Sequence, residues 1–188
     1  MYYDTRQVLS AREDELLFYP LPVVMDSEGN DLNAQPSLNM LAITSRLGLK
    51  IQSPDVLGAK TTGFLEADFS GSTNSGINMF RLRHAYVNME WRTSELLVGQ
   101  YWTPLVLPEI MPGTRPLNMG VPFHPYSRYV QARFLQHIGD FELIGVAAFQ
   151  LDNKSSGPDG MNTQYLRHSC IPELTLQLRY NTDRVFVG

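Results

Sequence analysis

Hydrophobic and polar residues alternate one by one over long stretches of this chain. In 173–180 (ELTLQLRY), every second residue is leucine or tyrosine, and threonine, glutamine and arginine lie between them. A period of two is typical of a β-strand with one apolar and one polar face, whereas helical spacing is scarce here. The pattern predicts strands at 38–52, 61–70, 79–91, 95–101, 128–138, 141–151 and 173–180, with partial strands near 1–6 and 184–188.

The alternation slips once, within 79–91. Phe80 and Leu82 begin the apolar face of this strand, but Ala85 continues it with the opposite parity. One extra residue in a strand shifts the phase in this way, so the slip predicts a β-bulge near Arg83–His84.

Opposite charges select a register for the hairpin of the second and third full strands. Asp68 then lies opposite Arg81. Glu66 lies opposite Arg83, so unlike charges meet twice on the polar face. For the fifth and sixth strands, 128–138 and 141–151, agreement between apolar partners selects a register in which paired residue numbers sum to 279. The apolar pairs expected from the two registers are Phe69 with Phe80, Phe134 with Gly145, Ala132 with Ala147, and Val130 with Phe149.

Short and long connections alternate along the chain. The shorter ones are at 53–60, 92–94, 139–140 and 181–183, and the long ones are at 7–37, 71–78, 102–127 and 152–172. In a meander this order places the long loops at one end of the sheet. The fold class predicted is therefore all-β, an antiparallel up-and-down meander.

Alternation alone fits two kinds of protein. A soluble or surface-associated β-sheet ligand-binding module would bury the apolar face, and its long loops would form the ligand surface. A transmembrane β-barrel would turn that face to lipid. Segments of about ten residues match the 9–11 that cross a bilayer, and long loops at one end match outer-membrane barrels. Aromatic residues near the strand ends suit the two membrane interfaces. They are Trp91, Tyr101, Trp102, Tyr129, Phe141, Phe149 and Tyr180.

Composition excludes several other classes. The 188 residues carry a net charge of −4, which gives no basic surface for nucleic acid. The single cysteine, Cys170, excludes an internal disulfide, and the four histidines show no metal-binding spacing. No catalytic motif is present, so we expect no enzyme, no metal and no cofactor. We expect a single partial barrel domain over 1–188, truncated at both ends.

Four strings carry a family resemblance: YDTRQ (3–7), FRLRHAYVNMEW (80–91), LLVGQYWTPL (96–105) and GVPFHPYSRYVQARF (120–134). They resemble the porin-like proteins of Gram-negative outer membranes, namely the phosphate-selective porin O/P and DcaP-like group and the porins of Bacteroidetes. The resemblance implies the N-terminal part of a barrel of about 16 to 18 strands, which forms a homotrimer when complete. It implies outer-membrane lipid as partner and passive diffusion of small hydrophilic solutes or ions, with no nucleic acid.

The resemblance also suggests which residues meet the solute. The polar faces would line the pore through Arg46, Lys50, Glu66, Asp68, Arg81, Arg83, Glu90, Arg133 and Arg179. The proline-rich loop 102–127 would form the constriction with Glu109, Arg115 and His124. The facing acidic and basic residues would either create a transverse field across the pore or serve as a plain structural ladder of ion pairs.

Overall fold

The structure is a computed structural model that describes residues 2–4, 8–10, 17–20, 22–40, 42–43, 45–70, 78–110, 127–151 and 155–188. The chain divides into two compact units. The first comprises Met1–Arg46, Asp68–Arg81 and Pro112–His124, and the second comprises Leu47–Ala67, Leu82–Met111 and Pro125–Gly188. Each unit is described by itself below.

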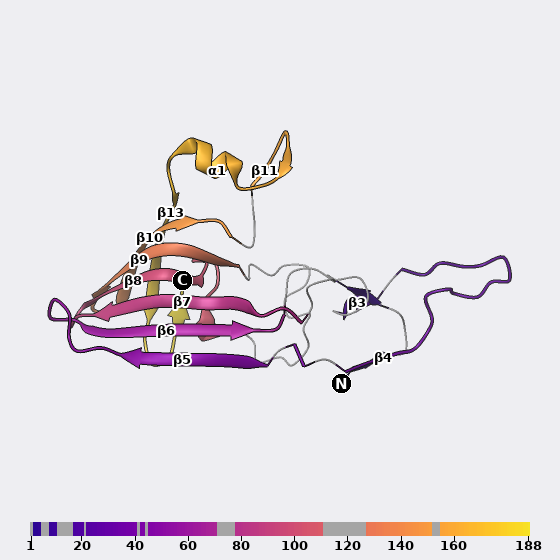
Figure 1. The fold of residues 1–188 in the computed structure, drawn as a ribbon, viewed down its shortest axis with the longest axis horizontal. Helices are drawn as coiled ribbons and strands as arrows, with labels where there is room; N and C mark the ends of the chain where they lie inside the picture. The colour runs from indigo at the N-terminus through magenta and orange to yellow at the C-terminus, as the bar shows by residue number, and fades with distance from the viewer. Residues whose placement is uncertain are drawn as a thin grey trace. The chain divides into compact units, whose positions relative to one another are not determined.

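An eight-stranded sheet makes up most of the second unit (Figure 1). Its order is β14-β13-β10-β9-β8-β7-β6-β5, so neighbours in the sheet follow one another along the chain and form an antiparallel meander. The strands are β5 (Arg46–Gln52), β6 (Lys60–Asp68), β7 (Arg81–Glu90), β8 (Ser94–Trp102), β9 (Arg128–Ile138), β10 (Phe141–Phe149), β13 (Glu173–Asn181) and β14 (Phe186–Val187). The predicted fold class is confirmed.

Smaller elements occupy the long connections. In the second unit, η2 (Pro108–Ile110) follows β8, and β11 (Ser156–Gly157), β12 (Gly160–Met161) and α1 (Gln164–Ser169) lie between β10 and β13. In the first unit, β1 (Tyr2–Asp4) pairs with β4 (Ser37–Asn39), and β2 (Val8–Ser10) pairs with β3 (Leu17–Pro20). Among the helices of the described segments, none has the length and apolarity to cross a membrane.

A turn in the first unit is held by one carboxylate. The Asp26 Oδ1 accepts the backbone N–H groups of Asn30 and Glu28, both at 2.8 Å. The N–H of Asn30 does most to lower the pKa of this exposed carboxyl below its ordinary value, because the bond favours the charged form.

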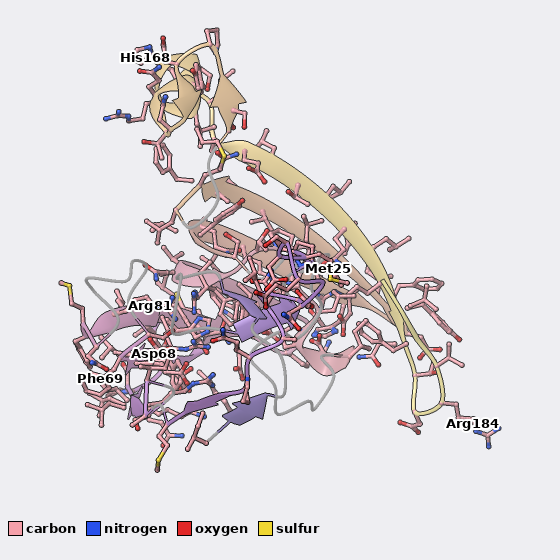
Figure 2. The ribbon with its side chains drawn as sticks, turned by 90° about the vertical axis from the view of Figure 1, so that its right-hand side faces the viewer. Met25, Asp68, Phe69, Arg81, His168 and Arg184 are labelled. Atoms are coloured by element: carbon pink, nitrogen blue, oxygen red, sulfur yellow. The ribbon has the colours of Figure 1, made fainter. Side chains whose placement is uncertain are left out.

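The predicted registers are confirmed. Along β9 and β10, Phe134 lies opposite Gly145, Ala132 opposite Ala147, and Val130 opposite Phe149. Between β6 and β7, Arg81 Nη2 is 3.1 Å from Asp68 Oδ2, and Arg83 Nε is 2.6 Å from Glu66 Oε1. The rings of Phe69 and Phe80 are 5.5 Å apart. In Figure 2, Asp68 and Arg81 lie side by side.

Several parts of the chain differ from the expected elements, and one of them is the connection 7–37, which contains the pair β2 and β3. The strand expected over 38–52 is divided into β4 and β5, because Ser45 N–H donates to the Ala42 carbonyl in a turn and Ile43 is buried there. The connection 152–172 contains the short helix α1. Its six residues show no apolar periodicity, so the sequence pattern did not predict this helix.

The shift of phase predicted in 79–91 is confirmed by burial along β7. Leu82 and Val87 are both exposed although five positions separate them, and the consecutive residues Arg83 and His84 are both buried. The bulge that would cause this shift stays a prediction. Gln100 on β8 donates its amide N–H groups to the carbonyls of Leu82 and Arg83, at 3.2 and 3.0 Å, and so binds the carbonyls at the irregular point.

Replacing Gln100 with methionine removes both of these bonds while keeping the size of the side chain. We expect Gln100→Met to lower the free energy of unfolding by about 1–2 kcal/mol, because two carbonyls lose their donor. Urea unfolding in lipid vesicles, followed by tryptophan fluorescence, measures the loss. Gln52→Met at the exposed end of β5 is the control, and an equal effect of the two variants would contradict this role of Gln100.

The two faces of the sheet have an inverted distribution of polarity. Large apolar side chains of successive strands are exposed, among them Leu49 (54%), Val98 (51%), Phe134 (48%) and Leu176 (76%). On the other face polar side chains are buried, among them Gln131, Arg133 and Arg179. A soluble sheet would show the reverse, because burying charge in a core costs far more than burying leucine. The sheet is part of a transmembrane β-barrel with its apolar face toward lipid.

Candidate functional site on the polar face of the sheet

A cavity of about 190 Å³ lies on the polar face of the second unit. It lies between strands β7, β8, β9 and β13 and the segment that follows β8. Its lining residues are Tyr86, Asn88, Glu95, Leu97, Tyr101, Pro108, Glu109, Arg133, Leu135 and Arg179. Three of the residues predicted to meet the solute therefore come together here: Glu109, Arg133 and Arg179.

The loop segment 103–110 lies against this polar face. Thr103 N–H donates to the Ser127 carbonyl at 2.9 Å, and Val106 N–H donates to the Thr103 carbonyl at 3.0 Å. Val106 is buried, and η2 follows within the same segment. Pro104 and Pro108 restrict φ in the segment, which favours a fixed path for this part of the loop.

Arg179 on β13 connects the loop segment 103–110 to the polar face of the sheet. Its Nη1 is 3.3 Å from Glu109 Oε1, across 70 residues of sequence, and 4.0 Å from Glu142 Oε2 on β10. Its Nε donates to Gln177 Oε1 at 3.2 Å. The side chain is almost fully buried, and its Nη2 has no hydrogen-bond partner within the described residues. A buried guanidinium gains most from nearby carboxylates, so Glu109 and Glu142 are natural partners.

Arg133 is the second buried cation of the cavity. Its guanidinium carbon lies 5.8 Å from the centre of the Tyr101 ring, within the range of a cation–π contact. Its Nη1 has no hydrogen-bond partner in the part of the chain that the structure describes. Arg133 as a residue lines the cavity, so its positive charge acts on whatever water or solute occupies that volume.

The acidic and basic residues shared by β6 and β7 are arranged differently. Arg81 binds Asp68 through both Nε and Nη2, each at 3.1 Å, and Arg83 binds Glu66 through Nε. Each guanidinium thus has its own carboxylate. This arrangement resembles a structural ladder more closely than a line of unbalanced charges.

The other predicted residues lie away from the cavity or outside the described residues. Arg46 and Lys50 are exposed on β5, at the edge of the sheet. Glu90, at the end of β7, accepts a hydrogen bond from Asn88 Nδ2 at 2.9 Å. Arg115 and His124 lie outside the described residues.

Aromatic residues line part of the polar face, which the sequence did not predict. The rings of Tyr86 and Tyr101 are 5.2 Å apart beside the cavity, and the rings of His84 and Trp102 are also 5.2 Å apart. Tyr129 belongs to a small buried cluster with Ile144, Val146 and Ala148. Placing Tyr101 and Tyr129 at a membrane interface was therefore wrong, because both rings are on the inner side of the sheet.

Other aromatic side chains agree with an interfacial position. Phe141 and Tyr180 are exposed at adjacent strand ends, with their rings 5.1 Å apart, and Phe149 is exposed at the opposite end of β10. Rings at both ends of the apolar face are typical of the aromatic belts of membrane barrels.

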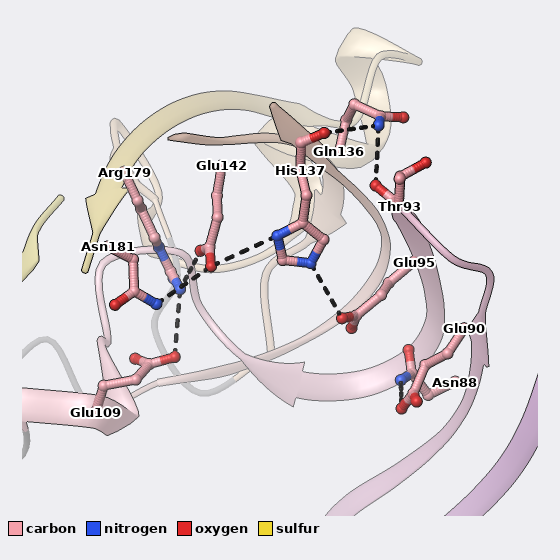
Figure 3. A network of polar contacts seen from close by, with 10 residues as sticks. All are labelled: Asn88, Glu90, Thr93, Glu95, Glu109, Gln136, His137, Glu142, Arg179 and Asn181. Atoms are coloured by element: carbon pink, nitrogen blue, oxygen red, sulfur yellow. Dashed lines mark hydrogen bonds and ion pairs between the residues drawn. The ribbon is translucent and has the colours of Figure 1, made fainter. Parts of the chain in front are cut away.

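Sequence reasoning left Glu95, His137 and Glu142 out of the site. His137 Nε2 is 3.6 Å from Glu95 Oε1, and its Nδ1 is 3.8 Å from Glu142 Oε1 (Figure 3). All three occupy the polar parity of their strands, which is the signal that could have revealed them. Among the described residues, no group of three or more acidic, histidine or cysteine side chains could hold a metal ion.

Comparisons with known proteins agree with this architecture. The chain is similar to the crystal structure of the outer membrane channel DcaP of Acinetobacter baumannii, with a TM-score of 0.63 and 22% identity. The match covers 97% of this chain and 46% of that one, so the chain spans about half the length of the channel. No curated protein sequence gives a significant match.

The family model described as DcaP outer membrane protein matches residues 24–187. This match supports the porin-like resemblance of the sequence, but not the narrower phosphate-selective porin O/P group. It also assigns the protein to the bacterial outer membrane. Since the matched residues make up most of the sequence, the chain belongs to the DcaP outer membrane protein family.

Proposed function

We propose that this chain forms part of the wall of an outer-membrane channel through which small hydrophilic solutes and ions diffuse passively. The observation that carries the proposal is the inverted sheet, in which Arg133 and Arg179 are on the inner face while leucine and phenylalanine side chains are exposed on the outer face. Lipid covers the outer face, and water and solute occupy the inner one.

The height of the apolar face supports this orientation. On β10, eight residue steps separate Phe141 from Phe149. At about 3.3 Å per residue and a strand tilt of about 40°, they span about 20 Å along the membrane normal. This is close to the apolar band of about 25 Å in outer-membrane barrels, so the two rings lie near the two interfaces.

We propose that the loop 102–127 narrows the lumen. The contact between Glu109 and Arg179 supports this role, since it holds the first part of the loop against the wall. Arg115 and His124 would extend the constriction. The proposed lining of the pore remains Arg46, Lys50, Glu66, Asp68, Arg81, Arg83, Glu90, Arg133 and Arg179.

A spanning sheet in lipid leaves no edge unpaired, so the complete channel must pair the outer edges of β5 and β14. We propose that residues 1–188 form a single partial domain of that barrel and that the complete protein forms a homotrimer in outer-membrane lipid. The experiment is to fold the full-length protein in detergent and to record single-channel conductance in a planar bilayer. Stepwise conductance and a heat-dependent shift in gel mobility are expected, and the absence of both would refute the channel.

Arg133 gives a direct test of the lumen. Arg133→Ala removes a positive charge from the cavity wall, so we expect the ratio of cation to anion permeability to rise by about twofold, allowing for screening by salt. The reversal potential in a salt gradient measures this ratio. Arg92→Ala, an exposed residue outside the cavity lining, is the control. Equal selectivity of wild type and Arg133→Ala would contradict a position of Arg133 in the lumen.

A further inference from the structure

A chain of charged side chains crosses the inner face of the second unit and ends on the loop segment 103–110. Glu95 on β8 is 3.6 Å from His137 on β9, and His137 is 3.8 Å from Glu142 on β10. Glu142 is in turn 4.0 Å from Arg179 on β13, which is 3.3 Å from Glu109 of η2. Figure 3 shows these five residues and the contacts that join each one to the next. A change of charge at His137 can therefore reach the loop segment through two intermediate side chains.

The strand register holds the centre of this chain in place. Glu142 is the direct partner of His137 on one side and of Arg179 on the other. His137 N–H donates to the Thr93 carbonyl at 2.8 Å, and Asn181 Nδ2 donates to Glu142 Oε1 at 3.3 Å. The backbones that carry the three central groups are therefore fixed as neighbours, and their side chains meet on the inner face.

Two carboxylates compete for the same nitrogen. Arg179 Nη1 is within 4.0 Å of both Glu109 and Glu142. The Arg179 side chain is 4% exposed and that of Glu142 is 13% exposed, whereas that of Glu109 is 49% exposed. The wall residues are thus confined, and Glu109 is the partner with room to leave. A cation that attracts Glu142 away from Arg179 therefore strengthens the contact between Arg179 and Glu109.

His137 is the group that can do so. Histidine is the side chain that ordinarily changes its charge between pH 5 and 8. The charged groups in contact with it are Glu95 on β8 and Glu142 on β10. Behind them lie Glu90 on β7, the strand partner of Glu95, and Arg179 on β13, the strand partner of Glu142. When the His137 imidazole is neutral, the Glu142 carboxylate interacts with the Arg179 guanidinium. An imidazolium gives Glu142 a second cation within 4 Å, and Arg179 is then left to Glu109.

We propose that His137 is a proton-sensitive control of the constriction: its protonation tightens the contact of the loop segment 103–110 with the wall and narrows the channel at acidic pH. This inference rests on the proposed channel function and adds a regulation that the function does not require.

The test is single-channel conductance of the full-length protein between pH 5.5 and 8. We expect the conductance of the wild type to fall by roughly a third to a half on acidification. His137→Gln should hold the conductance at its high-pH level throughout. Glu142→Gln should hold it at the low-pH level, because the competitor for Arg179 is gone.

His168→Gln is the matched control, since His168 is exposed on α1 and outside the chain of charges. It should keep the pH response of the wild type. A response that persists in His137→Gln, or a wild type without any response, would overturn the inference while the conductance itself still supports the channel.

A distance measurement tests the inference without conductance. Nitroxide labels at Leu105→Cys on the loop segment and Asp183→Cys in the β13–β14 turn, in a Cys170→Ser background, report the position of the segment relative to the wall. We expect the distance distribution to narrow from pH 8 to pH 5.5, and His137→Gln to abolish the narrowing. Identical distance distributions at the two pH values would refute the proposed role of His137 even if no conductance were recorded.

Discussion

Gly99→Ala is expected to prevent β7 and β8 from pairing and so to abolish the folded barrel. Gly99 has φ of +134°, which L-residues with a side chain rarely adopt. A Cβ at this position would lie 2.2 Å from the Ala85 carbonyl oxygen and 2.6 Å from Tyr86 Cα. Both are backbone atoms of the neighbouring strand, so they cannot move without disrupting the pairing.

The expected loss combines backbone strain and a clash, each of which costs about 1–3 kcal/mol or more. A folded barrel migrates differently from the heated protein, so the loss of that mobility shift measures the effect. Gly145→Ala on β10 is the control, because nothing lies within 4 Å of its ideal Cβ. Equal folding of the two variants would show that the close approach of β7 to Gly99 is absent.

Leu176→Lys is expected to destabilise the protein in lipid by about 2–4 kcal/mol, the cost of a lysine on the lipid face near the bilayer midplane. Leu176 is near the middle of β13 and is 76% exposed. On a face in contact with water the same substitution would cost almost nothing. The variant thus distinguishes hydrocarbon from water on this side of the sheet.

The adjacent Thr175→Lys is the matched control, since Thr175 has the opposite parity on β13 and is half-buried on the polar face of the sheet. There the ammonium group stays hydrated, and we expect a change below about 0.5 kcal/mol. Urea unfolding in vesicles compares the two. Similar small effects of both variants would contradict a lipid-facing Leu176.

The strands and their registers could be predicted because the signals are local. Period-two alternation fixes the face of each residue, and unlike charges at 66, 68, 81 and 83 select a single alignment. Each strand pairs with the next one along the chain, so no long-range choice was needed. The structure confirms both alignments.

The candidate site was harder to predict because its contacts are not local. Glu109 meets Arg179 across 70 residues, and no periodicity relates the two positions. Tyr101 has the same parity on β8 as Glu95 and Leu97, which line the cavity with it, so the alternation places its ring on the inner face although its position at the strand end suggested a membrane interface. Glu95 and Glu142 followed the alternation, but each became meaningful only when the registers placed His137 between them.

The meander order has a consequence for biogenesis. Because sequential strands are neighbours, the sheet can grow hairpin by hairpin with little loop-closure entropy lost at each addition. The bond between Arg179 and Glu109 cannot form until β9, β10 and β13 have all been added. An insertion intermediate that stops at β10 would therefore hold the loop segment 103–110 through the bond of Thr103 to Ser127 but without the contact to Arg179, which forms when β13 is added.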